Sequence, residues 1–168
     1  MTATELIALL DLKPLPLEGG YFRETYRCAD RVTASALPPR YGRDKALGTA
    51  IFYLLTPDTF SAMHRLPTDE VFHFYLGDPV EMLLLEPDHP GRVATLGSDL
   101  AAGQRPQIVV PAGVWQGSLL APGGRVALLG TTMAPGFDPL DFELGDPETL
   151  ARGWPEFREA IRTRAPKP

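Results

Sequence analysis

Proline and glycine recur along this chain at intervals too short for long helices. The 168 residues include 18 prolines and 16 glycines, and breakers such as Gly77-Asp78-Pro79 and Pro122-Gly123-Gly124 separate short apolar segments. Many short segments at near-regular spacing are typical of antiparallel sandwiches and barrels. We therefore predict an all-β fold with strands at about 47–55, 60–64, 71–76, 80–86, 92–96, 106–110, 115–120 and 125–133, preceded by one over 21–26.

Short helices are expected only near the two ends of the chain. Thr4 is a candidate N-cap for an amphipathic helix that Lys13-Pro14 ends. Asp146-Pro147 has the residue types of an N-cap and first helical position, and a second helical segment begins at Trp154-Pro155. The segment 37–45 holds two prolines, a glycine and several charges, and is predicted to be a loop.

Length and composition exclude several classes of protein. A chain of 168 residues is predicted to form one domain, residues 1–168, with a proper core. Its net charge of −5 is spread along the chain without a Lys/Arg stripe, so we expect no nucleic-acid partner. No apolar run approaches the roughly 20 residues of a membrane span. The single cysteine, Cys28, and an N-terminus unlike a signal peptide predict a cytoplasmic protein.

One stretch carries the residues from which chemistry can be inferred. His64, Glu70 and Gly77 follow the spacing H-x5-E-x6-G, and Pro111-Ala112-Gly113-Val114-Trp115-Gln116 comes later in the chain. This pairing resembles the two motifs of the cupin superfamily. The resemblance implies a cupin double-stranded β-helix, a jelly-roll barrel with short N- and C-terminal helices here, and a pocket inside the barrel.

Further segments narrow the resemblance to one family. They are similar to the cupin-5 family, formerly DUF985, whose members are RmlC-like cupins, and they span most of the chain. The resemblance implies a small single-domain jelly roll, usually a homodimer, and says little about activity. The segments are Glu18–Tyr26, Gly48–Leu55, Asp69–Pro79, Gly103–Gln107 and Val110–Gln116.

The metal site of metal-binding cupins is incomplete here. In those proteins three histidines and the glutamate converge inside the barrel, but the second and third histidine positions of this chain are Leu66 and Gln116. Zinc and iron sites generally need three good protein ligands. We therefore predict no metal cofactor; if a weakly bound divalent metal is present, its ligands would be His64, Glu70 and Gln116.

His73 has two interpretations. In a regular strand Glu70, Phe72 and Phe74 share one face, whereas His73 and Tyr75 share the other. His73 then joins Glu70 only if a bulge resets the register. Otherwise it is a hydrogen-bonded residue on the opposite face.

We expect the pocket to combine acid–base groups with aromatic and polar binding groups. The predicted catalytic residues are His64, Glu70 and Tyr75, with Tyr53 as another possible proton donor. Phe52, Phe72, Phe74 and Trp115 are expected to point inward, although aromatic side chains also fill the core of any small barrel. The predicted ligand-binding residues are His73, Gln116, Trp115, Phe52, Phe72 and Arg23.

Three functions remain open at the level of sequence. The first is a metal-independent isomerase or epimerase acting on a carbohydrate-like ligand with His64 as base, since an imidazole can accept a proton near neutral pH. Gly20-Tyr21-Phe22-Arg23-Glu24 is similar to a stretch of the metal-free dTDP-sugar 3,5-epimerases, which implies the same role for His64. The second is a non-enzymatic ligand-binding or sensing cupin. The third is a metal-dependent enzyme using His64, Glu70, Gln116 and His73.

Overall fold

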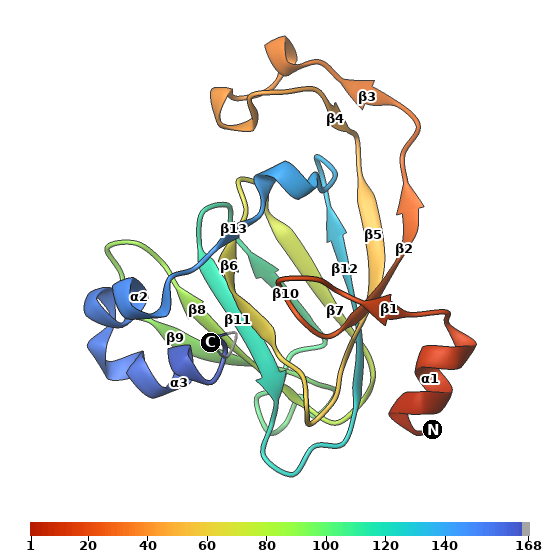
Figure 1. Cartoon of the computed structure of the whole chain (residues 1–168), viewed down its shortest axis with the longest axis vertical. Coiled ribbons are helices and arrows are strands. Elements are labelled where there is room, and N and C mark those ends of the chain that lie inside the picture. The colour runs from red at the N-terminus through yellow and green to blue at the C-terminus, as the bar shows by residue number, and fades with distance from the viewer. Residues whose placement is uncertain (166–168) are drawn as a thin grey trace.

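Two antiparallel sheets face each other in the computed structural model, which describes residues 1–165 (Figure 1). The larger sheet has the strand order β1-β2-β5-β12-β7-β10, and the smaller has the order β13-β6-β11-β8-β9. The bounds of the larger sheet's strands are β1 Lys13–Pro14, β2 Tyr21–Arg27, β5 Thr49–Leu55, β7 Glu70–Gly77, β10 Gln107–Val110 and β12 Ala127–Met133. Those of the smaller are β6 Ser61–Arg65, β8 Val80–Leu85, β9 Arg92–Leu96, β11 Trp115–Leu120 and β13 Glu143–Leu144.

The main core lies between the two sheets. On β8, Val80, Met82 and Leu84 point into it, while Leu83 and Leu85 point the opposite way. This alternation follows from the two-residue period of a strand. Burying each large apolar side chain stabilises the fold by about 1.5–3 kcal/mol, so these inward residues hold the sheets together.

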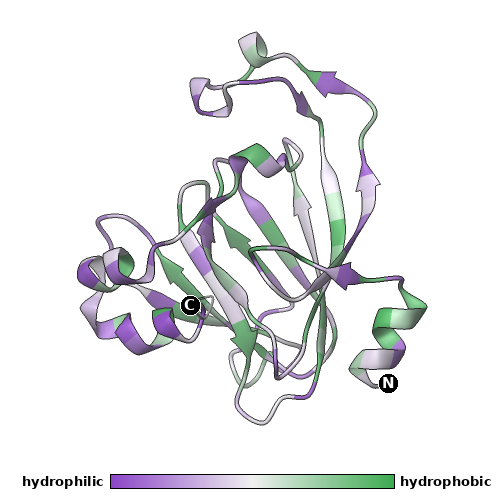
Figure 2. Ribbon diagram, viewed as in Figure 1, coloured by the Kyte–Doolittle hydropathy of each residue, from purple (hydrophilic) through white to green (hydrophobic). Residues whose placement is uncertain are grey.

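Helices cover part of the outer face of each sheet. The N-terminal helix α1, Ala3–Leu9, packs on one end of the larger sheet, where Leu6 meets Leu54 and Leu128. The helices α2, Pro147–Gly153, and α3, Arg158–Arg162, cover the smaller sheet. Short 3-10 turns are η1 Ala34–Ala36, η2 Pro39–Tyr41, η3 Pro139–Asp141 and η4 Pro155–Phe157. Figure 2 shows hydrophobic residues concentrated in the strands and in α1.

A mostly hydrophilic arm projects from the barrel between β2 and β5 (Figures 1 and 2). It contains the two-stranded pair of β3, Arg31–Val32, and β4, Lys45–Ala46. At its base the buried Lys45 ammonium lies 2.5 Å from a carboxylate oxygen of Asp141, beside η3. The ion pair therefore anchors the arm to the segment that leads into β13.

The predicted all-β class and every long strand are confirmed, with bounds within two residues of those expected. Four two-residue strands, β1, β3, β4 and β13, were not predicted, because so short a pairing leaves no periodic signal. The first helix begins two residues early: its N-cap is Thr2, not Thr4, and Thr2 and Glu5 form a capping box. In residues 1–165 no helix is long and apolar enough to cross a membrane.

Candidate active site in the barrel interior

His64 lies on β6 with its imidazole inside the barrel. The side chain is buried, and Nδ1 lies 2.7 Å from the backbone oxygen of Ala62. A carbonyl oxygen only accepts hydrogen bonds, so Nδ1 is the donor, and the lone pair of the neutral ring is then on Nε2. None of the side chains in residues 1–165 hydrogen-bonds to Nε2. That nitrogen is therefore available to accept a proton or hydrogen bond from a ligand.

A hydrogen bond that crosses the interior joins the two sheets beside His64. Gln116 on β11 is the register partner of His64, and its Nε2 donates to Oε2 of Glu70 on β7 at 2.7 Å. The other amide atom, Gln116 Oε1, is buried and has no hydrogen-bond partner within residues 1–165. An unpaired buried acceptor costs about 1–3 kcal/mol. A donor supplied by a ligand or by water would remove that cost.

The surroundings of Glu70 favour its protonated form. Burial raises the pKa of Glu70, because the interior solvates a carboxylate poorly, and the nearby charge of Glu18 raises it further. His64 has the second-largest effect and lowers the pKa, as do hydrogen bonds from Thr131 and Gln116, but burial prevails. A carboxyl group with a raised pKa next to an imidazole with a free lone pair is the arrangement that acid–base catalysis requires.

Glu18 is a second interior carboxylate that the sequence did not single out. It lies in the turn between β1 and β2, and its Oε1 accepts a hydrogen bond from Ser61 Oγ at 2.8 Å. The turn presses against the barrel, since a Cβ at Gly19, where φ is +96°, would lie 2.4 Å from the backbone oxygen of Phe60. The sequence Glu18-Gly19-Gly20 could have indicated this position, because two glycines allow the backbone of a turn to pack closely and hold the preceding glutamate near the core.

Tyr53 on β5 is the tyrosine of the interior. It is fully buried, and its hydroxyl donates to the backbone oxygen of Gly19 at 3.0 Å. Burial raises the pKa of Tyr53 well above its ordinary value, and the charge of Glu18 adds to the effect. The group therefore remains a phenol, a hydrogen-bond partner and not a base.

The prediction that Glu70, Phe72 and Phe74 share one face of β7 and His73 lies on the other is confirmed. Phe72 and Phe74 face the core between the sheets, on the same side as Glu70. His73 lies on the outer face, where its Nε2 is 3.1 Å from Thr132 Oγ1. The expectation that places Tyr75 with the interior groups is wrong, because Tyr75 is 49% exposed on that outer face.

Phe52, Arg23 and Trp115 also lie outside the barrel interior. Phe52 faces outward on the larger sheet, edge-on to Tyr75 with ring centroids 6.0 Å apart, and the Arg23 guanidinium lies 5.7 Å from its centroid. Trp115 faces α2 and α3 on the smaller sheet, under the guanidinium of Arg65 at 4.5 Å. The prediction that Phe52 and Trp115 point inward is wrong: both side chains pack on outer faces.

The donor atoms of this interior suit a transition metal poorly. Among residues 1–165 no group of three or more histidine, cysteine, aspartate or glutamate residues could hold a metal ion. His64 Nε2, one Glu70 oxygen and Gln116 Oε1 offer one imidazole, one carboxyl and one amide oxygen. Zinc and iron sites generally use three stronger ligands, so we derive no chemical step through a metal.

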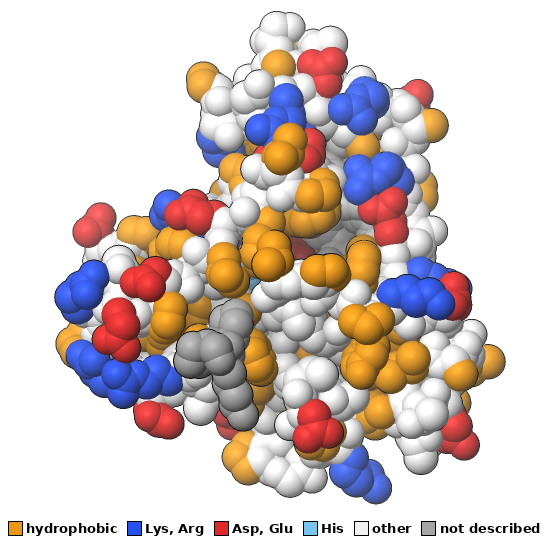
Figure 3. Space-filling view, in the orientation of Figure 1, with side chains coloured by type: hydrophobic (Ala, Val, Ile, Leu, Met, Phe, Trp, Pro, Cys, Tyr) orange, Lys and Arg blue, Asp and Glu red, His pale blue; other side chains and the backbone are white. Residues whose placement is uncertain are grey.

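The interior opens on one face of the molecule, and the Phe142 ring lies against His64. Figure 3 shows a central hollow on this face, rimmed by hydrophobic side chains, with acidic atoms visible inside it. The rings of Phe142 and His64 are stacked, with centroids 4.9 Å apart and planes 22° from parallel. Phe142 directly follows η3, so the segment anchored by Lys45 also shields the imidazole.

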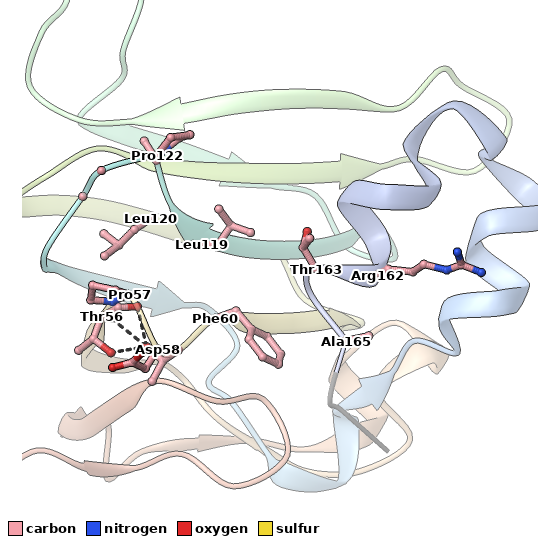
Figure 4. Close-up of a pocket in the computed structure, with 14 residues that line it drawn as sticks. Thr56, Pro57, Asp58, Phe60, Leu119, Leu120, Pro122, Arg162, Thr163 and Ala165 are labelled. Carbon is pink, nitrogen blue, oxygen red and sulfur yellow. Dashed lines mark hydrogen bonds between the residues drawn. The ribbon is translucent and has the colours of Figure 1, made fainter.

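Two other cavities lie outside the barrel interior. The larger, of about 740 Å³, is lined by the β5–β6 and β11–β12 loops and the end of α3 (Figure 4). Its ionisable lining residues, Asp58 and Arg162, form no ion pair with each other among the described residues. The smaller, of about 360 Å³, lies between η2, β6 and β13. Neither is lined by His64, Glu70 or Gln116, so we place the candidate active site in the interior despite their size.

Comparison with known proteins agrees with this fold. The family model described as Cupin superfamily (DUF985) matches residues 4–145. The chain belongs to this family. This cupin is 30% identical to YML079W, an uncharacterised protein of Saccharomyces cerevisiae, over 154 residues that cover 86% of the chain and 73% of the relative.

Solved structures of similar sequence share the whole fold of this cupin. A hypothetical protein from Leishmania major superposes with a TM-score of 0.88 at 30% identity, covering 99% of this chain and 100% of that one. Protein SO0799 from Shewanella oneidensis gives 0.85 at 32% identity, covering 100% and 99%. Oxalate decarboxylase from Bacillus subtilis gives 0.54 at 15% identity, covering 95% of this chain and 38% of that one, which shows the fold alone.

Proposed function

We propose that this cupin binds a small carbohydrate-like molecule inside its barrel and isomerises or epimerises it without a metal. The observation that carries the proposal is the hydrogen bond from His64 Nδ1 to Ala62. It fixes the imidazole in the tautomer whose Nε2 can accept a proton. In such a reaction Nε2 removes the proton from a carbon next to a carbonyl, and a proton returns to a different carbon or face.

Glu70 is the candidate partner of His64 in this reaction. Its raised pKa makes it a better proton donor near neutral pH than an ordinary glutamate. The hydrogen bond from Gln116 holds the carboxyl in place across the interior. Tyr53, and not Tyr75, is the tyrosine close enough to take part, as a hydrogen-bond donor that positions Gly19 and the turn carrying Glu18.

Exchange with heavy water tests the proposal before the product is known. A base that removes a carbon-bound proton exposes it to solvent, so incubation with sugars and nucleotide sugars in D₂O should place deuterium on one ligand carbon, seen by NMR. His64→Gln, which cannot act as a base, should abolish exchange. His89→Gln is the matched control, because His89 is an exposed histidine. Exchange that persists in the His64 variant would refute the role of His64.

A binding function without turnover is the second candidate. The unpaired Gln116 Oε1 favours it, because a buried acceptor is satisfied by a bound molecule whether or not a reaction follows. In that case His64→Gln should keep most of the ligand-induced rise in melting temperature, and the natural protein should show no deuterium exchange. Thermal-shift and exchange measurements on the same panel therefore separate the two functions.

We also propose that the chain forms a homodimer through the outer face of the larger sheet. Arg23, Phe52, Gly130, His73 and Gln107 form one cross-strand row there. Helix α1 covers this face near Leu54 and Leu128, and it leaves Tyr75 and Val109 each 49% exposed. Light scattering after size exclusion should give twice the chain mass, and Val109→Lys should give the monomer mass.

A further inference from the structure

The open polar atoms of the interior accept hydrogen bonds. His64 Nδ1 is occupied by Ala62, which leaves the Nε2 lone pair, and the donor end of Gln116 is occupied by Glu70, which leaves Oε1. Glu18 accepts a hydrogen bond from Ser61 through Oε1 and also interacts with the Tyr53 hydroxyl. A ligand that matches this set must bring hydrogen-bond donors.

The interior also lacks a cation. Within residues 1–165 neither Glu18 nor Glu70 forms an ion pair with lysine or arginine. The fully buried cation of the arm, Lys45, is paired with Asp141. The buried Arg164 donates to backbone oxygens, including that of Gly117. Charged groups removed from water are normally paired, so the Glu18 carboxylate, which has no lysine or arginine partner, points to a positive charge supplied from outside.

Accepting the interior as the ligand site of the proposed function, we propose that the ligand carries a protonated amine and that Glu18 is its counterion. The ligand class is thus an amine-bearing polyol, such as an amino sugar. Its hydroxyls would meet the acceptors of His64 and Gln116, and its ammonium would meet the Glu18 carboxylate. Ligands with a carboxylate or phosphate at that position would be repelled.

Glu18 suits this role better than Glu70. Its side chain is half-buried in a turn at the edge of the barrel, so it is reached from solvent. Ser61 orients the carboxylate through one oxygen only. Hydrogen bonds between an ammonium and a carboxylate are about twice as strong as those between neutral groups, so this contact would set ligand preference.

Three sugars that differ in one charge test the proposal. Glucosamine, glucose and glucuronate are titrated calorimetrically at about pH 6.5, where a sugar amine is protonated. We expect glucosamine to bind most tightly and glucuronate most weakly. Glu18→Gln keeps an oxygen to accept from Ser61 but removes the charge, and should weaken glucosamine binding about tenfold while changing glucose binding less than about twofold. Glu156→Gln, at an exposed glutamate, is the control and should change neither.

The outcomes separate this inference from the function on which it rests. If glucose or glucuronate binds as tightly as glucosamine, the ammonium site is refuted and the interior pocket stands. If Glu18→Gln weakens all three sugars equally, Glu18 only shapes its turn, and the inference again fails. If no sugar binds to the natural protein, the carbohydrate-like ligand class fails, and the amine site fails with it.

Discussion

Replacing Glu70 with glutamine tests whether the interior carboxyl is kept at a cost in stability. Burial raises the pKa of Glu70, so the folded chain retains a proton that the unfolded chain releases at lower pH. The stability contributed by this group is complete below the unfolded pKa and is lost as pH rises through the folded pKa. Each unit of elevation is worth about 1.4 kcal/mol, so Glu70→Gln should be more stable than the natural protein near pH 7.

The comparison is made by urea unfolding across the acid-to-neutral range. The variant keeps an oxygen that accepts from Gln116 Nε2, so the hydrogen bond across the interior remains. Its advantage should shrink as pH falls toward about 4.5, the ordinary range of a glutamate, and should be absent below it. In a domain of this size each kcal/mol corresponds to about 2–4 °C in melting temperature. A variant that is less stable by the same amount at every pH would refute the reasoning, and Glu156→Gln should show no pH-dependent difference.

Three further substitutions test the packing around the site. Lys45→Met removes the buried cation of Asp141 and leaves the Arg43 guanidinium 3.9 Å away, so it should lower the free energy of unfolding by about 3 kcal/mol in urea; a loss below about 1 kcal/mol would contradict a buried ion pair. Phe142→Ala removes the ring stacked on His64 and should speed its modification by diethyl pyrocarbonate several-fold, whereas an unchanged rate would mean that Phe142 does not shield it. Gly130→Ala would place a Cβ 2.3 Å from the Tyr75 hydroxyl and should cost about 1–3 kcal/mol, and adding Tyr75→Phe should recover part of that loss.

The fold and the residues around His64 could be predicted because their signals are local. The strands end at Pro and Gly breakers, and the first residues of β7 alternate regularly, so the position of Glu70 also fixes the faces of Phe72 and His73. The resemblance to the cupin motifs predicted that β7 of the larger sheet lies near β6 and β11 of the smaller sheet. Periodicity by itself could not have brought them together, since sheet order depends on long-range pairing.

The faces of Phe52 and Trp115 could not be predicted, because both sides of their strands are apolar. The run Ile51-Phe52-Tyr53-Leu54-Leu55 has no polar residue to mark the outside. Its outer face is apolar because it packs beside α1, and that of Trp115 because it meets α2 and α3. A strand covered on both sides loses the alternation from which direction is read. The position of Glu18 could not be predicted for another reason, because a turn has no periodic pattern. The close packing of Gly19 against Phe60 shows that the turn carrying Glu18 lies against the barrel.

The residues at the two altered histidine positions explain how the site is organised. Leu66 is buried, and its backbone oxygen accepts from the backbone N–H of Gly113, so that position supports the loop before β11. The Gln116 amide nitrogen donates a hydrogen bond to Glu70, and its amide oxygen is left unpaired in the interior. A histidine there would offer a metal a strong ligand, whereas the amide fixes a carboxyl and leaves a contact for a donor. The interior is thus built around hydrogen bonds, with the His64 lone pair and the Glu70 carboxyl as the groups that can exchange protons.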